Sequence, residues 1–133
     1  MTSKTEKQSG LSLHEIERQI YRVRGHKVLF DSDLARLYGV TTFNLNKAVK
    51  RNLERFPLDF MFRLTNQEVS DLKFQNGISS SPSHGGRRSL PYVFTQEGVA
   101  MLSSVLRSEE SVRVNILIMR AFVRLKEMAI GHD

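Results

Sequence analysis

Short blocks of hydrophobic and polar positions along the chain predict a mixture of strands and helices. Two β-prone runs, 20–23 and 27–30, flank Gly25, which can adopt a positive φ, so a β-hairpin is expected there. Residues 13–19 suit either a short helix or the lead-in to a strand. Two further short strands are predicted, at 60–63 and 92–94.

Side chains that cap helices mark the expected helix starts. Asp31-Ser32-Asp33 precedes a short helix over 33–38, and Gly39 ends it because glycine tolerates the left-handed conformation. Either Thr41 or Thr42 caps a second helix that runs to about Leu53. The remaining helices follow a Thr65-x-x-Glu68 capping box, Thr95 and Ser108, and run to about Phe74, Leu106 and Ala129.

Residues 31–50 have the pattern of a helix-turn-helix. The small Ala35 stands where two helices would cross closely, and Gly39 follows at the turn. Apolar residues occupy the packing positions, namely Leu34, Tyr38, Val40, Leu45 and Ala48. The spacing therefore predicts two short helices that cross steeply.

A helical projection of the second helix, at about 100° per residue, separates an apolar face from a basic one. Leu45, Ala48, Val49 and Leu53 are expected to pack inward. The opposite face carries Phe43, Asn44, Lys47, Lys50 and Arg51, with Thr42 and Asn46 nearer its margin. Between residues 41 and 55 there are four basic residues, of which Arg55 is the last, and one acidic residue. The helix placed to enter a groove of duplex DNA is thus positive on its free face.

The residue types on this face suit DNA. Lysine and arginine neutralise phosphates, and asparagine can pair with adenine in the major groove. Thr42 and the helix N-terminus are expected to hold a phosphate. Phe43 either touches a thymine methyl or packs under the preceding hairpin. The competing interpretation is that Lys47, Lys50 and Arg51 simply form a solvated helix face.

A second basic candidate is the pair Arg87 and Arg88, in the polar, Gly/Ser-rich segment 76–89. They either reach a phosphate or the minor groove, as a wing does, or lie solvated in a flexible loop.

The last helix is apolar around most of its circumference, apart from a polar stripe of Arg113, Arg120, Arg124 and Glu127. Such a helix must be covered on more than one side. A second copy of the chain is the simplest cover, giving a homodimer that matches a two-fold DNA site. The alternative is a central core helix within one monomer.

Length and charge agree with these expectations. The 133 residues suit one domain over 11–130, after a polar tail at 1–10 that we expect to be disordered. The fold class expected is α+β, mainly helical, with a helix-turn-helix, a small β-hairpin or wing, and a long C-terminal helix. Twenty Lys+Arg against 14 Asp+Glu give a net charge of +6, which fits a nucleic-acid binder or simply a basic soluble protein.

Several classes of protein are disfavoured. There is no cysteine, the longest mainly apolar run is 115–119, and the polar start does not resemble a secretory signal, so we expect a cytoplasmic protein without membrane contact. The four histidines are scattered, so no metal or cofactor is expected. Helix capping explains Asp31 and Asp33 better than paired catalytic carboxylates do, and nothing requires an enzyme.

Three blocks, in order, carry a family resemblance: IYRVRGHKVLFDSDLARLYGV, KRNLERFPLDFMFRLTNQE, and GGRRSLPYVFTQEGVAMLSSVL followed by NILIMRAFVRLKE. From about residue 13 to 128 the chain resembles the ORF-six N-terminal domain, a relative of the KilA-N domain of phage and bacterial proteins. The resemblance implies a DNA-binding module of phage antirepressor-type proteins. A C-terminal domain often follows in that family. Only residues 131–133 follow the last helix here, so we expect that any such domain is absent or has been removed.

The first hypothesis is therefore sequence-specific binding of duplex DNA by a prophage-type transcriptional regulator or antirepressor. The alternative is a protein-interaction module that binds a repressor through the apolar C-terminal helix. RNA binding is a third option, disfavoured because no aromatic platform is evident beyond Phe43.

Overall fold

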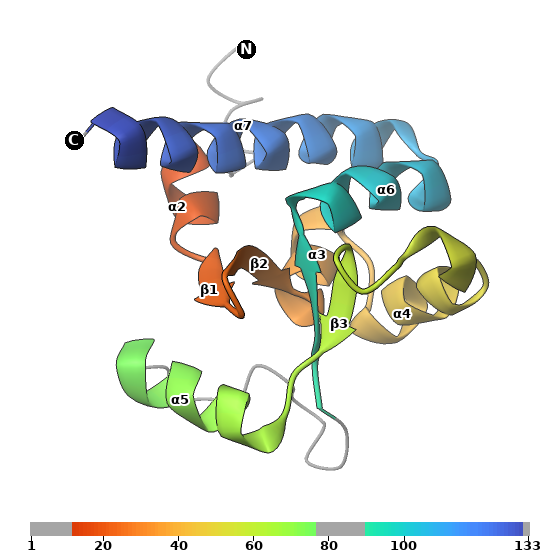
Figure 1. Cartoon of the computed structure of the whole chain (residues 1–133). Coiled ribbons are helices and arrows are strands. Elements are labelled where there is room, and N and C mark those ends of the chain that lie inside the picture. The colour runs from red at the N-terminus through yellow and green to blue at the C-terminus, as the bar shows by residue number, and fades with distance from the viewer. Residues whose placement is uncertain (1–11, 77–89, 132–133) are drawn as a thin grey trace.

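A small antiparallel sheet lies at the centre of the computed structural model, which describes residues 12–76 and 90–131 (Figure 1). Its strands are β1 (Tyr21–Val23), β2 (His26–Phe30), β3 (Met61–Arg63) and β4 (Tyr92–Thr95), in the order β1-β2-β4-β3. The hairpin is confirmed, because β1 pairs with β2 and Val23 lies opposite His26. Both turn residues have positive φ, 54° at Arg24 and 80° at Gly25, as a two-residue turn that follows the strand twist requires.

Helices cover both faces of this sheet. They are α2 (Leu13–Glu17), α3 (Asp31–Tyr38), α4 (Thr42–Lys50), the 3-10 turn η1 (Leu53–Arg55), α5 (Asn66–Asn76), α6 (Gln96–Leu106) and α7 (Glu109–Gly131). Figure 1 shows α5 alone on one side of the sheet and α7 on the other, running over α2 and α6. A mainly helical chain with a small sheet and a long C-terminal helix confirms the α+β class.

Successive side chains of the strands belong to two different hydrophobic clusters. Leu29 and Phe94 lie opposite each other and join the larger cluster, which the helices on the α7 side cover. Their neighbours Val28 and Val93 point the other way, into a smaller cluster that Leu72 of α5 covers. Because successive side chains of a strand point to opposite faces of the sheet, this one sheet contributes to two hydrophobic cores.

Most of the expected caps are confirmed. Gly39 ends α3 with φ 74°, and the Thr41 hydroxyl, rather than that of Thr42, accepts from the Asn44 N–H at 3.0 Å. The other caps are Thr65 on Glu68, Thr95 on Gly98 and Ser108 on Ser111. Each of these bonds spans three residues, which is why the sequence alone predicted them.

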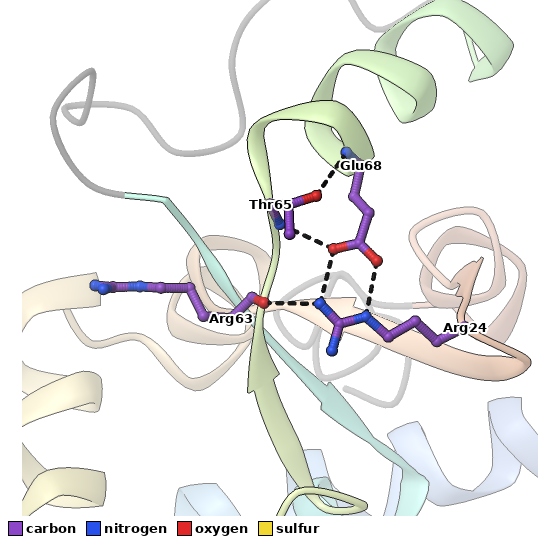
Figure 2. A network of polar contacts seen from close by, with 4 residues as sticks. All are labelled: Arg24, Arg63, Thr65 and Glu68. Atoms are coloured by element: carbon purple, nitrogen blue, oxygen red, sulfur yellow. Dashed lines mark hydrogen bonds and ion pairs between the residues drawn. The ribbon is translucent and has the colours of Figure 1, made fainter.

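Figure 2 shows how the hairpin turn is fastened to the start of α5. The Arg24 guanidinium donates to both carboxylate oxygens of Glu68, at 2.7 and 2.9 Å, and to the Arg63 carbonyl at 3.2 Å. It also lies 4.4 Å from the centre of the Phe62 ring. Glu68 completes the capping box by accepting from the Thr65 N–H at 2.8 Å. Arg24, the first residue of the hairpin turn, therefore attaches the N-terminal end of α5 to the hairpin.

One helix boundary and two packing predictions were wrong. The second helix ends at Lys50 and not near Leu53, because the Asn52 side chain donates to the Ala48 carbonyl and a 3-10 turn follows. That turn leaves Leu53 54% exposed instead of buried. Val40, in the interhelical turn, is 36% exposed and does not join the core.

The last helix is partly a core helix and partly uncovered. The side of α7 that faces the fold is buried, at Ser111, Val114, Asn115, Ile118, Ala121 and Phe122. Its other side leaves Val112, Ile116, Val123 and Met128 between 46% and 50% exposed. No helix within residues 12–76 and 90–131 is long and apolar enough to cross a membrane.

Candidate nucleic-acid interface

The apolar face of α4 fixes this helix against two neighbours. Leu45 and Val49 are 0% and 2% exposed, and α4 packs on α3 and α6. Ala35, 2% exposed in α3, is the small residue that the helix-turn-helix pattern required at the crossing. The inward positions Leu45 and Val49 are thus as predicted, and the register of the exposed face follows from them.

A buried hydrogen-bond group sets the position of α4 further. Asp31, 4% exposed, accepts from the Ser32 N–H at 2.8 Å, the Asn46 side-chain amide at 2.9 Å and the Tyr92 N–H at 3.3 Å. One carboxylate thereby joins the first turn of α3, the middle of α4 and strand β4. Burial raises the pKa of Asp31 above its usual value, while the bonds from Asn46, Tyr92 and Ser32 act in the opposite direction.

This group corrects two interpretations of the sequence. Helix α3 begins at Asp31 itself, after Phe30, and Phe30 makes no side-chain cap. Asp31 is therefore not the expected N-cap; it links segments that are distant in sequence. Asn46 donates to Asp31, and its Oδ1 atom is buried, so its amide faces the protein and not a groove. No local pattern indicated this pair, because its members lie fifteen residues apart.

The exposed face of α4 carries the residues that the helical projection placed there. Phe43, Asn44, Lys47, Lys50 and Arg51 are all exposed. Phe43 is 73% exposed, so the interpretation that it packs under the hairpin is wrong. The Lys47 ammonium lies 5.7 Å from the centre of the Phe43 ring. Within the described parts of the chain, neither lysine forms an ion pair with an acidic residue, and nor does Arg51.

The N-terminal end of α4 differs from the other helix starts. Helices α2, α3, α5, α6 and α7 each have an acidic residue in the first turn, whereas α4 has none. Helix geometry also leaves the N–H groups of Thr42 and Phe43 without an intrahelical acceptor. Thr42 itself is only half-exposed. The positive end of this helix dipole is thus not offset by an acidic side chain of its own turn.

The remaining candidate residues are placed differently. Arg55 lies in η1, beyond the end of α4, and donates to the Ser104 hydroxyl of α6 at 3.2 Å. Arg87, Arg88 and the tail at 1–10 lie outside the described residues. Among the residues that are described, no group of three histidine, cysteine or acidic side chains is arranged to hold a metal ion.

Comparison with known protein families gives a match over the first two thirds of the fold. The model of the ORF6N domain family, the ORF-six N-terminal domain, matches residues 18–105, more than half of the 133-residue chain. The matched range contains the sheet, α3 and α4, whereas α7 lies beyond it. No curated protein and no solved structure matches the chain.

Proposed function

The chain belongs to the ORF6N domain family, and from that premise we propose that it binds duplex DNA through the exposed face of α4. The observation that carries the proposal is a short helix with two buried apolar anchors, Leu45 and Val49, and an opposite face that is exposed and basic. Such a helix, the second of a helix-turn-helix, fits the width of the major groove.

The basic residues supply the affinity that does not depend on sequence. Lys47, Lys50 and Arg51 lie on one face without acidic partners among the described residues, so contact with phosphates breaks no ion pair of the fold. Three phosphate contacts give a slope of about −2.7 in a plot of log K against log salt. The open N-terminus of α4 adds a site for a phosphate.

Base contacts are assigned to the first turns of α4. Asn44 is exposed, and an asparagine side chain can bond to the adenine edge in the major groove. Asn46 is excluded from base contact, because its amide is bound to Asp31; its role in the proposal is to hold α4 in position. Arg55 is assigned to the margin of the DNA-binding surface, because it donates to Ser104 of α6.

Fluorescence anisotropy with a random-sequence duplex at two salt concentrations tests the proposal. We expect the variant Lys47→Glu with Lys50→Glu to bind far more weakly than the parent. Its neutral counterpart, Lys47→Gln with Lys50→Gln, should reduce the salt slope by about two. Both lysines are exposed, so circular dichroism should show an unchanged fold.

The matched control changes the same charge elsewhere. Arg18 and Arg22 are exposed, at the end of α2 and in β1, and Figure 1 shows α2 and β1 on the side of the molecule away from α4. The variant Arg18→Glu with Arg22→Glu has the same net charge as the α4 variant. If the two folded variants lose affinity equally, or neither loses any, then α4 is not the DNA-binding helix.

The biological role that fits is that of a prophage-type transcriptional regulator or antirepressor acting on DNA in the cytoplasm. This role requires binding and no catalysis, metal or cofactor. Duplex RNA is the competitor in the same assay; its deep, narrow major groove does not admit a helix, so we expect it to bind more weakly.

A homodimer through α7 is proposed as the arrangement that presents two α4 helices. The exposed or half-buried apolar residues Val112, Ile116, Met119 and Val123 follow the 4-3-4 spacing of a helix that packs on another helix. A hollow of about 370 Å³ lies beside them, lined by Arg120 and Arg124 as well as Glu127. A second copy that lays the same apolar stripe against this one covers these residues on both helices.

Sedimentation across a concentration series tests the dimer. The parent should associate, and Ile116→Glu with Val123→Glu should be monomeric. The control Leu58→Glu changes a residue that is 81% exposed in the turn before β3, and it should leave the dimer intact. A parent that stays monomeric refutes the homodimer. The repressor-binding alternative instead requires that this monomer form a complex with a repressor, and that the complex remain intact at high salt.

A further inference from the structure

An exposed phenylalanine, Phe43, stands on the basic face of α4. It is 73% exposed, whereas Phe30 and Phe94 are completely buried and Phe122 is 2% exposed. An aromatic ring in water forgoes the stabilisation that its burial would bring, so the fold gains little from phenylalanine here.

The position of Phe43 in the helix does not explain the ring either. With Thr41 as the N-cap, the two residues that a hydrophobic staple would join are Val40 and Leu45, and Phe43 is neither. The residues that do anchor α4 in the core are Leu45 and Val49. Phe43 is thus an apolar side chain available for contact with something other than the protein.

The surroundings of the ring indicate what it contacts. Phe43 is the second residue of α4, Asn44 follows it, and Lys47 lies one turn later with its ammonium 5.7 Å from the ring centre. A ring, an amide and a cation therefore share one surface at the N-terminal end of the second helix. In helix-turn-helix proteins these N-terminal residues contact the base edges.

We propose that Phe43 recognises thymine by covering its C5-methyl group, an inference that rests on the DNA-binding role proposed above. The thymine methyl is the apolar group that bases present in the major groove, where every other recognition element is a hydrogen-bond donor or acceptor. Lys47, held beside the ring, contacts the neighbouring phosphate. Thymine is thus selected by apolar contact, and Asn44 serves the adjacent adenine.

Two duplexes that differ only in this methyl group test the inference. One is an alternating adenine–thymine duplex, and the other has deoxyuridine at every thymine. We expect the parent to bind the thymine duplex more tightly, by roughly fourfold for each methyl group that it buries. Phe43→Ala should bind both duplexes equally, while Phe43→Leu should retain part of the preference.

A matched control removes a different exposed ring. Phe74 is 89% exposed on α5, on the opposite side of the sheet, so Phe74→Ala should retain the preference of the parent. A parent that binds both duplexes equally, with affinity that falls steeply with salt, overturns the Phe43 inference and leaves the DNA-binding role standing. A parent that binds neither duplex overturns both. Full thymine preference in Phe43→Ala also overturns the inference.

Discussion

Gly98 offers the sharpest test of how the fold is held together. In an ordinary helix, replacing glycine by alanine stabilises by about 0.5–1 kcal/mol, because the unfolded chain loses conformational freedom. Gly98 lies in the first turn of α6, where a Cβ atom would stand 2.8 Å from the Phe60 carbonyl carbon and closer still to its oxygen. A real Cβ atom does not approach backbone so closely, so the segment before β3 must move.

The cost follows from what that movement disturbs. The Phe60 carbonyl accepts from the Thr95 N–H at 3.0 Å, and the Thr95 hydroxyl caps α6 on Gly98 itself at 3.3 Å. A lost hydrogen bond costs about 1 kcal/mol and forced overpacking about 1–3 kcal/mol. After the helix-propensity gain is subtracted, we expect Gly98→Ala to lower the free energy of unfolding by about 2 kcal/mol.

Urea unfolding followed by circular dichroism measures this change as a lower midpoint with an unchanged m-value. Ala100→Gly is the matched control, because Ala100 is exposed in the same helix and reports the propensity effect alone, about 1 kcal/mol. If Gly98→Ala is as stable as the parent or more stable, the close approach of α6 to Phe60 is wrong.

Two further predictions concern pH. The hydrogen bond from Arg24 holds the pKa of Glu68 below its ordinary value of 4.5, so the pair stabilises above that pH and its contribution disappears as the pH falls through the lowered pKa. A double-mutant cycle with Arg24→Ala and Glu68→Gln should give a coupling of about 0.5–1 kcal/mol at neutral pH and none in acid. Burial raises the pKa of Tyr38 to about 12, so stability from the neutral phenol is present below pH 10 and is lost as the pH rises through 12. Absorbance titration should show a last phenol step that is absent in Tyr38→Phe, whereas the raised pKa of Tyr21 is unchanged. This variant should also lose about 1 kcal/mol of stability, because Asn115 donates to the Tyr38 hydroxyl at 3.0 Å.

The exposed face of α4 was predicted well, because the signals that define it are local. The face of α4 follows from helical periodicity, and the exposed positions Lys47, Lys50 and Arg51 are those of the projection. Periodicity does not say where a helix stops, and the side chain of Asn52 ended α4 before Leu53. Periodicity also does not show whether a residue at the margin of the exposed face points to solvent or to a buried partner. The orientation of Asn46 therefore became clear only from its hydrogen bond to Asp31.

The features that could be predicted from the amino acids alone have partners within a few residues: the hairpin turn at Gly25, the helix end at Gly39, and the caps at Thr65 and Thr95. The cap of α4 was narrowed to Thr41 or Thr42. The bonds of these features close short loops, so the amino acids that make them stand next to each other in the printed chain.

How the distant segments meet could be seen only in the folded protein. The tertiary structure placed β4 between β2 and β3, set the Asp31 carboxylate between α4 and β4, and brought Gly98 against Phe60. It also buried one side of α7 and left Ile116 and Val123 exposed. These contacts join residues that are far apart in sequence. The apolar or polar character of each residue indicates that it needs a partner, but it does not identify that partner.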